Sequence, residues 1–129
     1  MSKIVNFEDL EIWQKARDIC IEVYKIRKKS QLKTDYRLYD QINAASGSIM
    51  DNIAEGFERN GNKEFVQFLS IAKASCGETR SQLYRVLDRK YINEEEFNTL
   101  LNKLKNLSMQ IGGFMNYLQK SDFKGSKFK

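Results

Sequence analysis

The chain is predicted to be an all-α protein, an antiparallel up-down-up-down four-helix bundle, and three features of the sequence indicate this. Its 129 residues include no proline and only seven glycines, whereas β-sheet proteins of this size normally use both in turns. Apolar residues recur at three- and four-residue spacing in four long segments. The connections between the segments are short, so consecutive helices are expected to be antiparallel neighbours within one domain, residues 1–119.

The first helix is predicted over residues 8–28, with Asn6 as its N-cap and Asp9 as the reciprocal partner of that cap. Its core stripe consists of Ile12, Ala16, Ile19, Val23 and Ile26. A second apolar stripe, about 100° further around the helix, consists of Trp13, Cys20 and Tyr24. The apolar arc is therefore wide for a surface helix.

The second helix is predicted over residues 35–58 and the third over residues 62–89, with Asn60 and Gly61 between them as helix-ending residues. The inward residues of the second helix are Leu38, Ile42, Ala45, Ile49 and Ile53. Those of the third are Phe65, Phe68, Leu69, Ala72, Cys76, Leu83, Val86 and Leu87.

The fourth helix is predicted from Asn93 to Gln119, because Asn93 and Glu96 stand at the spacing of a capping box. Its apolar stripe consists of Phe97, Leu100, Leu101, Leu104, Leu107, Ile111, Met115 and Leu118. Residues 120–129 are predicted to be a basic, disordered tail. The lysines of this tail are Lys120, Lys124, Lys127 and Lys129.

Beside the core stripe, the second and third helices each carry a line of polar residues, which is predicted to be a structural polar network. Counted from the turn near Asn60, Ser48 and Ser75 stand at the same height. Both lines lie on the same rotational side of their core stripe, and antiparallel helices have opposite rotational sense. The two lines therefore either face each other or both face away. Gly47 and Gly77 lie near this level and are expected to let the helix backbones approach closely. The network, within or between subunits, comprises Gln41, Ser48, Asn52, Glu55, Ser75, Glu78 and Gln82. The alternative is an ordinary polar flank in water.

Catalysis is disfavoured because the chain has no histidine, which removes the Ser-His and Cys-His nucleophilic pairs and the commonest general base. Glu55 and Glu78 could form a carboxylate pair, but their Ser, Asn and Gln neighbours fit a structural network better. No glycine-rich phosphate loop and no cofactor site are expected. Cys20 and Cys76 are expected to be reduced, buried thiols, with a metal site or a disulfide as the alternative.

The N-terminal segment lacks the apolar run of a signal peptide, and no stretch approaches the roughly 18 apolar residues of a membrane span. A cytoplasmic protein without a membrane partner is therefore expected. Phe123 and Phe128 among the tail lysines are a weak alternative signal for an anionic membrane surface.

The net charge of +5 and the pI near 9.2 favour anionic partners without requiring them. Basic residues cluster on one flank of the third helix and at the end of the first helix, and nucleic-acid binding is the functional hypothesis for both clusters. The candidate residues are Lys73, Arg80, Tyr84, Arg85 and Arg89 together with Lys25, Arg27, Lys28 and Lys29. The alternative is that these side chains only solvate the surface and complement helix dipoles.

Several motifs also resemble a known family over nearly the whole chain up to Leu118. They are Phe7-Glu-Asp-Leu10 with Trp13-Gln-Lys-Ala16, Gln41-Ile42, Ser48-Ile-x-x-Asn52-Ile-Ala-Glu-Gly56, and Ser75-x-x-Glu78 with Gln82-Leu83. The chain resembles the bacterial four-helix-bundle proteins encoded by intervening sequences in large-subunit ribosomal RNA genes. It is also similar to the accessory variability proteins of diversity-generating retroelements.

This resemblance implies a homopentameric ring of bundles without enzymatic activity. For the retroelement proteins it also implies binding to nucleic acid and to a reverse transcriptase through a basic surface. The expected function is therefore that of a non-catalytic accessory protein, which binds RNA or DNA without strong sequence preference and can also bind a nucleic-acid enzyme. The alternative is a scaffold that binds only proteins.

Overall fold

The computed structural model describes residues 4–123, and within this range it contains four long α-helices and no strand, which confirms the all-α prediction. Two short 3-10 helices precede α1 and α2. The elements are η1 (Phe7–Asp9), α1 (Glu11–Lys29), η2 (Gln31–Thr34), α2 (Tyr36–Glu58), α3 (Asn62–Asp88) and α4 (Glu94–Phe123).

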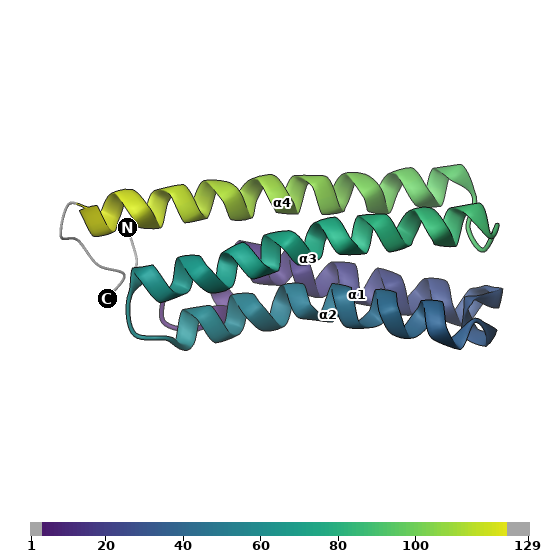
Figure 1. Cartoon of the computed structure of the whole chain (residues 1–129), viewed down its shortest axis with the longest axis horizontal. Helices are drawn as coiled ribbons and strands as arrows, with labels where there is room; N and C mark the ends of the chain where they lie inside the picture. The colour runs from purple at the N-terminus through teal and green to yellow at the C-terminus, as the bar shows by residue number, and fades with distance from the viewer. Residues whose placement is uncertain (1–3, 124–129) are drawn as a thin grey trace.

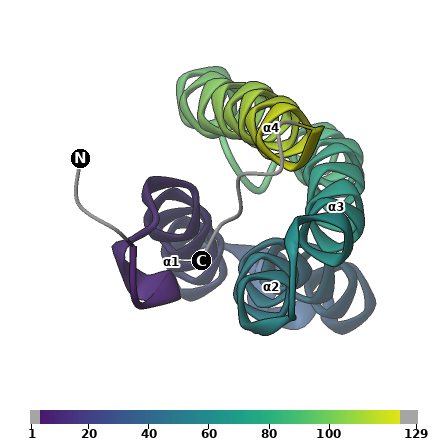
Figure 2. The ribbon, with the colours of Figure 1, turned by 90° about the vertical axis from the view of Figure 1, so that its left-hand side faces the viewer.

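The four helices lie lengthwise beside one another, and in Figure 1 the residue colours run to the right along α1 and α3 but to the left along α2 and α4. Seen along their length, α4, α3, α2 and α1 follow one another around an arc (Figure 2). The most extensive contact is between α2 and α3, and α1 and α4 contact each other the least of the neighbouring pairs. A hydrogen bond from Asn62 to the Leu118 carbonyl joins the start of α3 to the end of α4.

The start of α1 differs from the prediction. The helix begins at Glu11 rather than near Glu8, and the Asn6 side chain makes no cap hydrogen bond within the described residues. Residues Phe7–Asp9 form a separate 3-10 turn, after which Leu10 is extended, with φ −74° and ψ 128°. Leu10 is only 6% exposed, so its burial in the core explains the break in the helix.

The other helix ends follow from local side-chain chemistry. The predicted capping box is confirmed, because the Asn93 N–H donates to Glu96 Oε1 at 3.0 Å and the Glu96 N–H donates to Asn93 Oδ1 at 2.8 Å. Asp35 caps α2 by accepting from the Leu38 N–H. At the end of α3, Lys90 adopts φ 63°, and the backbone N–H groups of Lys90 and Tyr91 close a Schellman motif on Leu87 and Val86.

The predicted apolar stripes form the core, since most of their members are less than 9% exposed. The buried members include Ile19, Ile49, Leu69 and Leu104. The sequence analysis missed three core residues that lie between helices, namely Leu10, Leu32 and Ile92.

Small residues bring α2 and α3 together at Gly56 and not at the predicted glycines. A Cβ added to Gly56 would lie 2.7 Å from Phe68 Cβ and 2.9 Å from Phe65 Cδ1. A Cβ added to Gly47 or Gly77 would meet no atom of the described chain within 4 Å. The expectation for Gly47 and Gly77 is therefore wrong within the subunit, because their Cα hydrogens face open space.

The end of α4 also differs from the prediction, since the helix reaches Phe123 instead of ending at Gln119. No glycine or proline lies between Gln119 and Gly125, so nothing in this segment stops the helix earlier. The remainder of the predicted disordered tail, residues 124–129, lies outside the described residues.

Candidate nucleic-acid interface

The polar line between α2 and α3 is a hydrogen-bonded cluster at its centre. The Ser75 hydroxyl donates to Ser48 Oγ at 2.9 Å. Asn52 Nδ2 donates both to the Ser48 carbonyl at 2.8 Å and to Ser48 Oγ at 2.9 Å. The matched heights of Ser48 and Ser75 in the sequence therefore correspond to a direct contact that links the two helices.

The outer members of the predicted network are arranged differently. Arg85 Nη1 donates to Gln41 Oε1 and to Gln82 Oε1, both at 2.8 Å. The two glutamines are therefore linked through Arg85, which the sequence predicts to bind nucleic acid. Glu55 is exposed and accepts from Arg59 at 3.0 Å within α2. Glu78 is also exposed, and within residues 4–123 it has no hydrogen bond or ion pair. Within the subunit, neither glutamate belongs to the cluster, because both side chains are exposed.

Three of the predicted nucleic-acid-binding residues share the flank of α3 that lies beside α4. The Lys73 side chain covers Gly112, since a Cβ on Gly112 would lie 3.3 Å from Lys73 Cε. The Tyr84 ring is half exposed and meets Phe97 edge to face, with ring centroids 4.9 Å apart. Arg80 stands between Lys73 and Tyr84 on the same helix flank.

Lys73 and Arg80 are the cations of this flank, and Lys73 is exposed whereas Arg80 is half-buried. Within the described chain, neither forms a salt bridge. Arg80 Nε is buried and has no hydrogen-bond acceptor among the described residues. The two residues are two helical turns apart, which separates their Cα atoms by about 10 Å along α3.

Arg89, in contrast, takes part in a structural contact between α2 and α3. Its Nη1 lies 2.6 Å from Asp35 Oδ2, which also accepts from the Tyr91 hydroxyl at 2.8 Å. The hydrogen bonds from Tyr91 and Arg89 lower the pKa of the Asp35 carboxyl group. Arg85 and Arg89 therefore point toward α2, away from the flank that carries Lys73 and Arg80.

Two lysines of the cluster at the end of α1 are paired with carboxylates. Lys29 Nζ lies 2.6 Å from Glu96 Oε2, and Lys25 Nζ lies 3.8 Å from Glu22 Oε2. The hydrogen bond between Lys29 and Glu96 raises the pKa of Lys29 and lowers the pKa of Glu96. Lys29 therefore connects α1 to the start of α4.

The other two basic residues of this cluster lie over aromatic rings. The Arg27 guanidinium is 5.0 Å from the centroid of Tyr39, and the Lys28 ammonium is 5.8 Å from the centroid of Tyr24. The sequence analysis missed a third pair on α1, in which the Arg17 guanidinium lies 5.9 Å from the Trp13 centroid. The spacing of four residues between Trp13 and Arg17 was the available signal.

Both cysteines are free thiols, but only Cys76 is buried as expected, whereas Cys20 is half-buried. Cys76 is buried, and this burial raises the pKa of its thiol to about 12. The Cys20 thiol donates to the Ser46 carbonyl at 3.3 Å, and burial also raises its pKa. In the part of the chain that the structure describes, no three His, Cys, Asp or Glu side chains are placed to hold a metal ion. No helix in residues 4–123 is long and apolar enough to cross a membrane.

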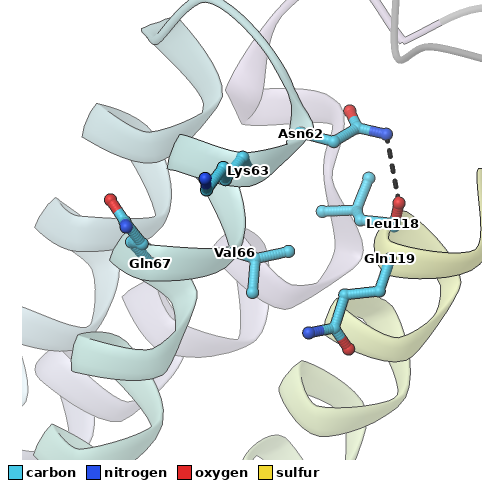
Figure 3. Close-up of a pocket in the computed structure, with 6 residues that line it drawn as sticks. All are labelled: Asn62, Lys63, Val66, Gln67, Leu118 and Gln119. Atoms are coloured by element: carbon cyan, nitrogen blue, oxygen red, sulfur yellow. Dashed lines mark hydrogen bonds between the residues drawn. The ribbon is translucent and has the colours of Figure 1, made fainter. Parts of the chain in front are cut away.

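A small pocket lies between the start of α3 and the end of α4 (Figure 3). Its volume is about 230 Å³, below the range of roughly 300–1,000 Å³ that is usual for ligand sites. Asn62, which is only 1% exposed, donates to the Leu118 carbonyl at 3.2 Å beside it. The pocket is lined by Asn62, Lys63, Val66, Gln67, Leu118 and Gln119.

A larger groove of about 420 Å³ lies between the start of α1 and the end of α4. Its walls are mainly apolar, with Leu10 and Ile12 on one side and Phe114 and Tyr117 on the other. The charged residue among its lining residues is Glu11, which does not suit a phosphate ligand.

Comparison with known proteins shows that residues 8–113 match the family described as 23S rRNA-intervening sequence protein. Among solved structures, the chain is similar to a protein of unknown function from the S23 ribosomal protein family of Bacteroides thetaiotaomicron. The TM-score is 0.74 at 19% sequence identity, and the match covers 81% of this chain and 97% of that chain. This likeness supports the four-helix fold. No curated protein matches the chain.

Proposed function

Because the chain belongs to the 23S rRNA-intervening sequence protein family, we propose that it is a non-catalytic accessory protein that binds the phosphate backbone of RNA or DNA. The observation that carries this proposal is the unpaired state of Lys73 and Arg80 within the described chain. Both side chains lie on one flank of α3, whereas most of the other predicted basic residues contact carboxylates, amides or aromatic rings of the same subunit.

The physical basis is electrostatic. A cation without an internal partner loses no ion pair when it binds a phosphate, and the released counterions favour binding. Arg80 offers a planar set of N–H donors to phosphate oxygens, and Lys73 adds a point charge about two helical turns away. Gly77, between them, leaves open space for a backbone to approach α3. No base-reading motif accompanies these residues, so binding is expected to tolerate sequence changes.

The proposal includes assembly of the antiparallel bundles into a homopentameric ring in the cytoplasm, with a nucleic-acid enzyme as a further partner. Large apolar side chains outside the core support self-association, although single exposed residues are common on monomers. They include Ile21, Ile71, Met109 and Tyr117, which are 43–74% exposed. A ring would repeat the site formed by Lys73 and Arg80 in each subunit and so strengthen weak binding.

The test is a gel-shift series with RNA and DNA duplexes of several sequences across a range of salt concentrations, on protein of measured mass. The double variant K73E/R80E should weaken binding equally for all sequences. It should also reduce the salt slope by about 2, since one unit is expected per phosphate contact. The matched control is K33E/R37E, because these exposed cations have no hydrogen bond or ion pair within residues 4–123 and the variant changes the net charge equally.

Unchanged binding by K73E/R80E would exclude this surface. A protein that binds neither RNA nor DNA at low salt, but retains partner proteins after nuclease treatment, would instead be the scaffold alternative. Light scattering of the same samples gives the subunit number, and a monomeric mass would refute the ring.

A further inference from the structure

Along one side of α1, cations lie over three aromatic rings, two on α1 itself and one on α2. We define this aromatic–cation flank as three pairs, two within α1 and one between α1 and α2. The cation-to-centroid distances are 5.9 Å for Arg17 over Trp13, 5.8 Å for Lys28 over Tyr24, and 5.0 Å for Arg27 over Tyr39.

The pairs follow one side of α1. Trp13, Arg17, Tyr24 and Lys28 follow one another at steps of four, seven and four residues, which places them on one side of a helix. From Trp13 to Lys28 the row extends about 22 Å. It lies next to α2, because Arg27 covers the Tyr39 ring. Figure 2 shows α1 at one end of the arc of helices, with α2 as its neighbour.

The flank is partly accessible and mainly cationic. The Tyr24 ring is 50% exposed, and both Arg17 and Lys28 are exposed. Trp13 and Tyr39 are half-buried against the core, and the Trp13 ring also meets Phe7 edge to face, with centroids 5.2 Å apart. The carboxylates of α1 are paired with lysines, as in the 2.9 Å contact between Asp18 and Lys103. The carboxylate of Asp51, on α2, is near Cys20 at the middle of the row.

Core packing accounts for the Trp13 and Tyr39 rings but not for the cations that lie over them. Among the described residues, four cations lie over aromatic rings, the fourth pair being Arg59 over Phe68 at 4.9 Å. Three of them lie on this one flank. Arg17 and Lys28 could lie in solvent without any cost to the core, which is built from the other side of α1.

We propose that the aromatic–cation flank is a stacking surface for the unpaired bases of single-stranded nucleic acid. Aromatic rings and guanidinium planes stack on bases whatever their sequence, and the same cations contact the phosphates between them. The inference rests on the proposed function, but it concerns a different helix from Lys73 and Arg80. It assigns single strands to α1, whereas the α3 site needs only a phosphate backbone.

Trp13 is the only tryptophan in the chain, so its fluorescence reports directly on this flank. The experiment titrates the full chain with a 12-nucleotide single strand, with an abasic strand of the same length and charge, and with a duplex. Quenching of Trp13 is expected with the base-containing single strand alone. Equal quenching by the abasic strand, or no quenching by any strand, would overturn the proposal.

The variant Tyr24→Ala tests the contact without removing core packing, since this ring is half exposed. One lost base stack should weaken single-strand binding by between about 5- and 150-fold, while duplex binding is unchanged. Tyr36→Ala is the matched control, because Tyr36 is 72% exposed and has no ring or cation contact among the described residues. If Tyr24→Ala binds single strands with wild-type affinity, the stacking surface is refuted, whereas the proposed function at Lys73 and Arg80 is unaffected.

The two proposals fail in different ways. If K73E/R80E loses duplex binding and still shows quenching of Trp13 by single strands, both surfaces are supported. If duplex binding depends on Lys73 and Arg80 but no single strand quenches Trp13, the proposed function stands and the stacking surface is refuted.

Discussion

Replacing Gly56 with alanine should destabilise the protein, although alanine is normally the better helix residue. A Cβ at this position would stand 2.7 Å from Phe68 Cβ, an atom fixed to the backbone of α3, and 2.9 Å from Phe65 Cδ1. Relieving this overlap requires α2 and α3 to separate, because rotation of a side chain cannot move a Cβ atom. Overpacking of this kind costs about 1–3 kcal/mol, and the fixed contact atom places Gly56→Ala at the upper end.

The gain in helix propensity, about 1 kcal/mol, offsets part of this cost and leaves a net loss of about 2 kcal/mol. With an unfolding entropy of about 2.1 cal/mol/K per residue and 129 residues, the expected fall in Tm is about 7 °C. Denaturant unfolding and thermal melts followed by circular dichroism, at one fixed protein concentration, measure both quantities.

Gly47→Ala is the matched control, because it lies in the same helix and its added Cβ would meet no described atom within 4 Å. This variant should gain about 0.5–1 kcal/mol from helix propensity and backbone entropy. The reasoning is refuted if Gly56→Ala is as stable as Gly47→Ala, since that would mean that α2 and α3 do not meet at Gly56.

Three further predictions concern single contacts. Lys90→Gly should stabilise the protein by about 1 kcal/mol in denaturant unfolding, because Lys90 has φ 63° and glycine adopts this conformation without strain; an unchanged midpoint would contradict it. Ser75→Ala should cost about 1 kcal/mol through the lost hydrogen bond to Ser48, whereas Ser81→Ala, on an exposed site of α3, should be neutral. The folded-state pKa of Asp35 is lowered, so its stabilising effect is present above its ordinary pKa of 3.8 and is lost as the pH falls below it. Asp35→Asn should therefore show a smaller loss of stability between pH 6 and pH 3 than the wild type, and identical pH profiles would argue against this contact.

Helical periodicity was sufficient to predict the part of the core that lies within the helices. Residues such as Ile19 and Leu104 lie on single stripes, and each stripe is buried because a helix can hide only one side against its neighbours. The capping box at Asn93 was also predictable, since both of its hydrogen bonds lie within four residues of sequence. Leu10 was missed because its burial depends on how the chain enters the bundle and not on local spacing.

The candidate site was less predictable, because its contacts join residues that are distant in sequence. Arg85 and Arg89 belong to the same basic segment as Arg80, yet they bind Gln41 and Asp35 on α2. Which arginine meets a partner depends on the rotation of α3 relative to α2, and a single sequence does not give this rotation. Within the described chain, local spacing alone could not show that Arg80 lacks a salt bridge.

The unequal packing around the arc means that the four helices differ in local stability. Because α2, α3 and α4 are in broad contact while α1 touches α4 only sparsely, α1 is the helix with the least contact to the other three, and we expect it to open first. Local opening would then detach α1 while the other three helices hold together, and its amide hydrogens would exchange with solvent before theirs. A ligand bound to α1 would slow this opening, so binding would be detected as slower hydrogen exchange of the α1 amides.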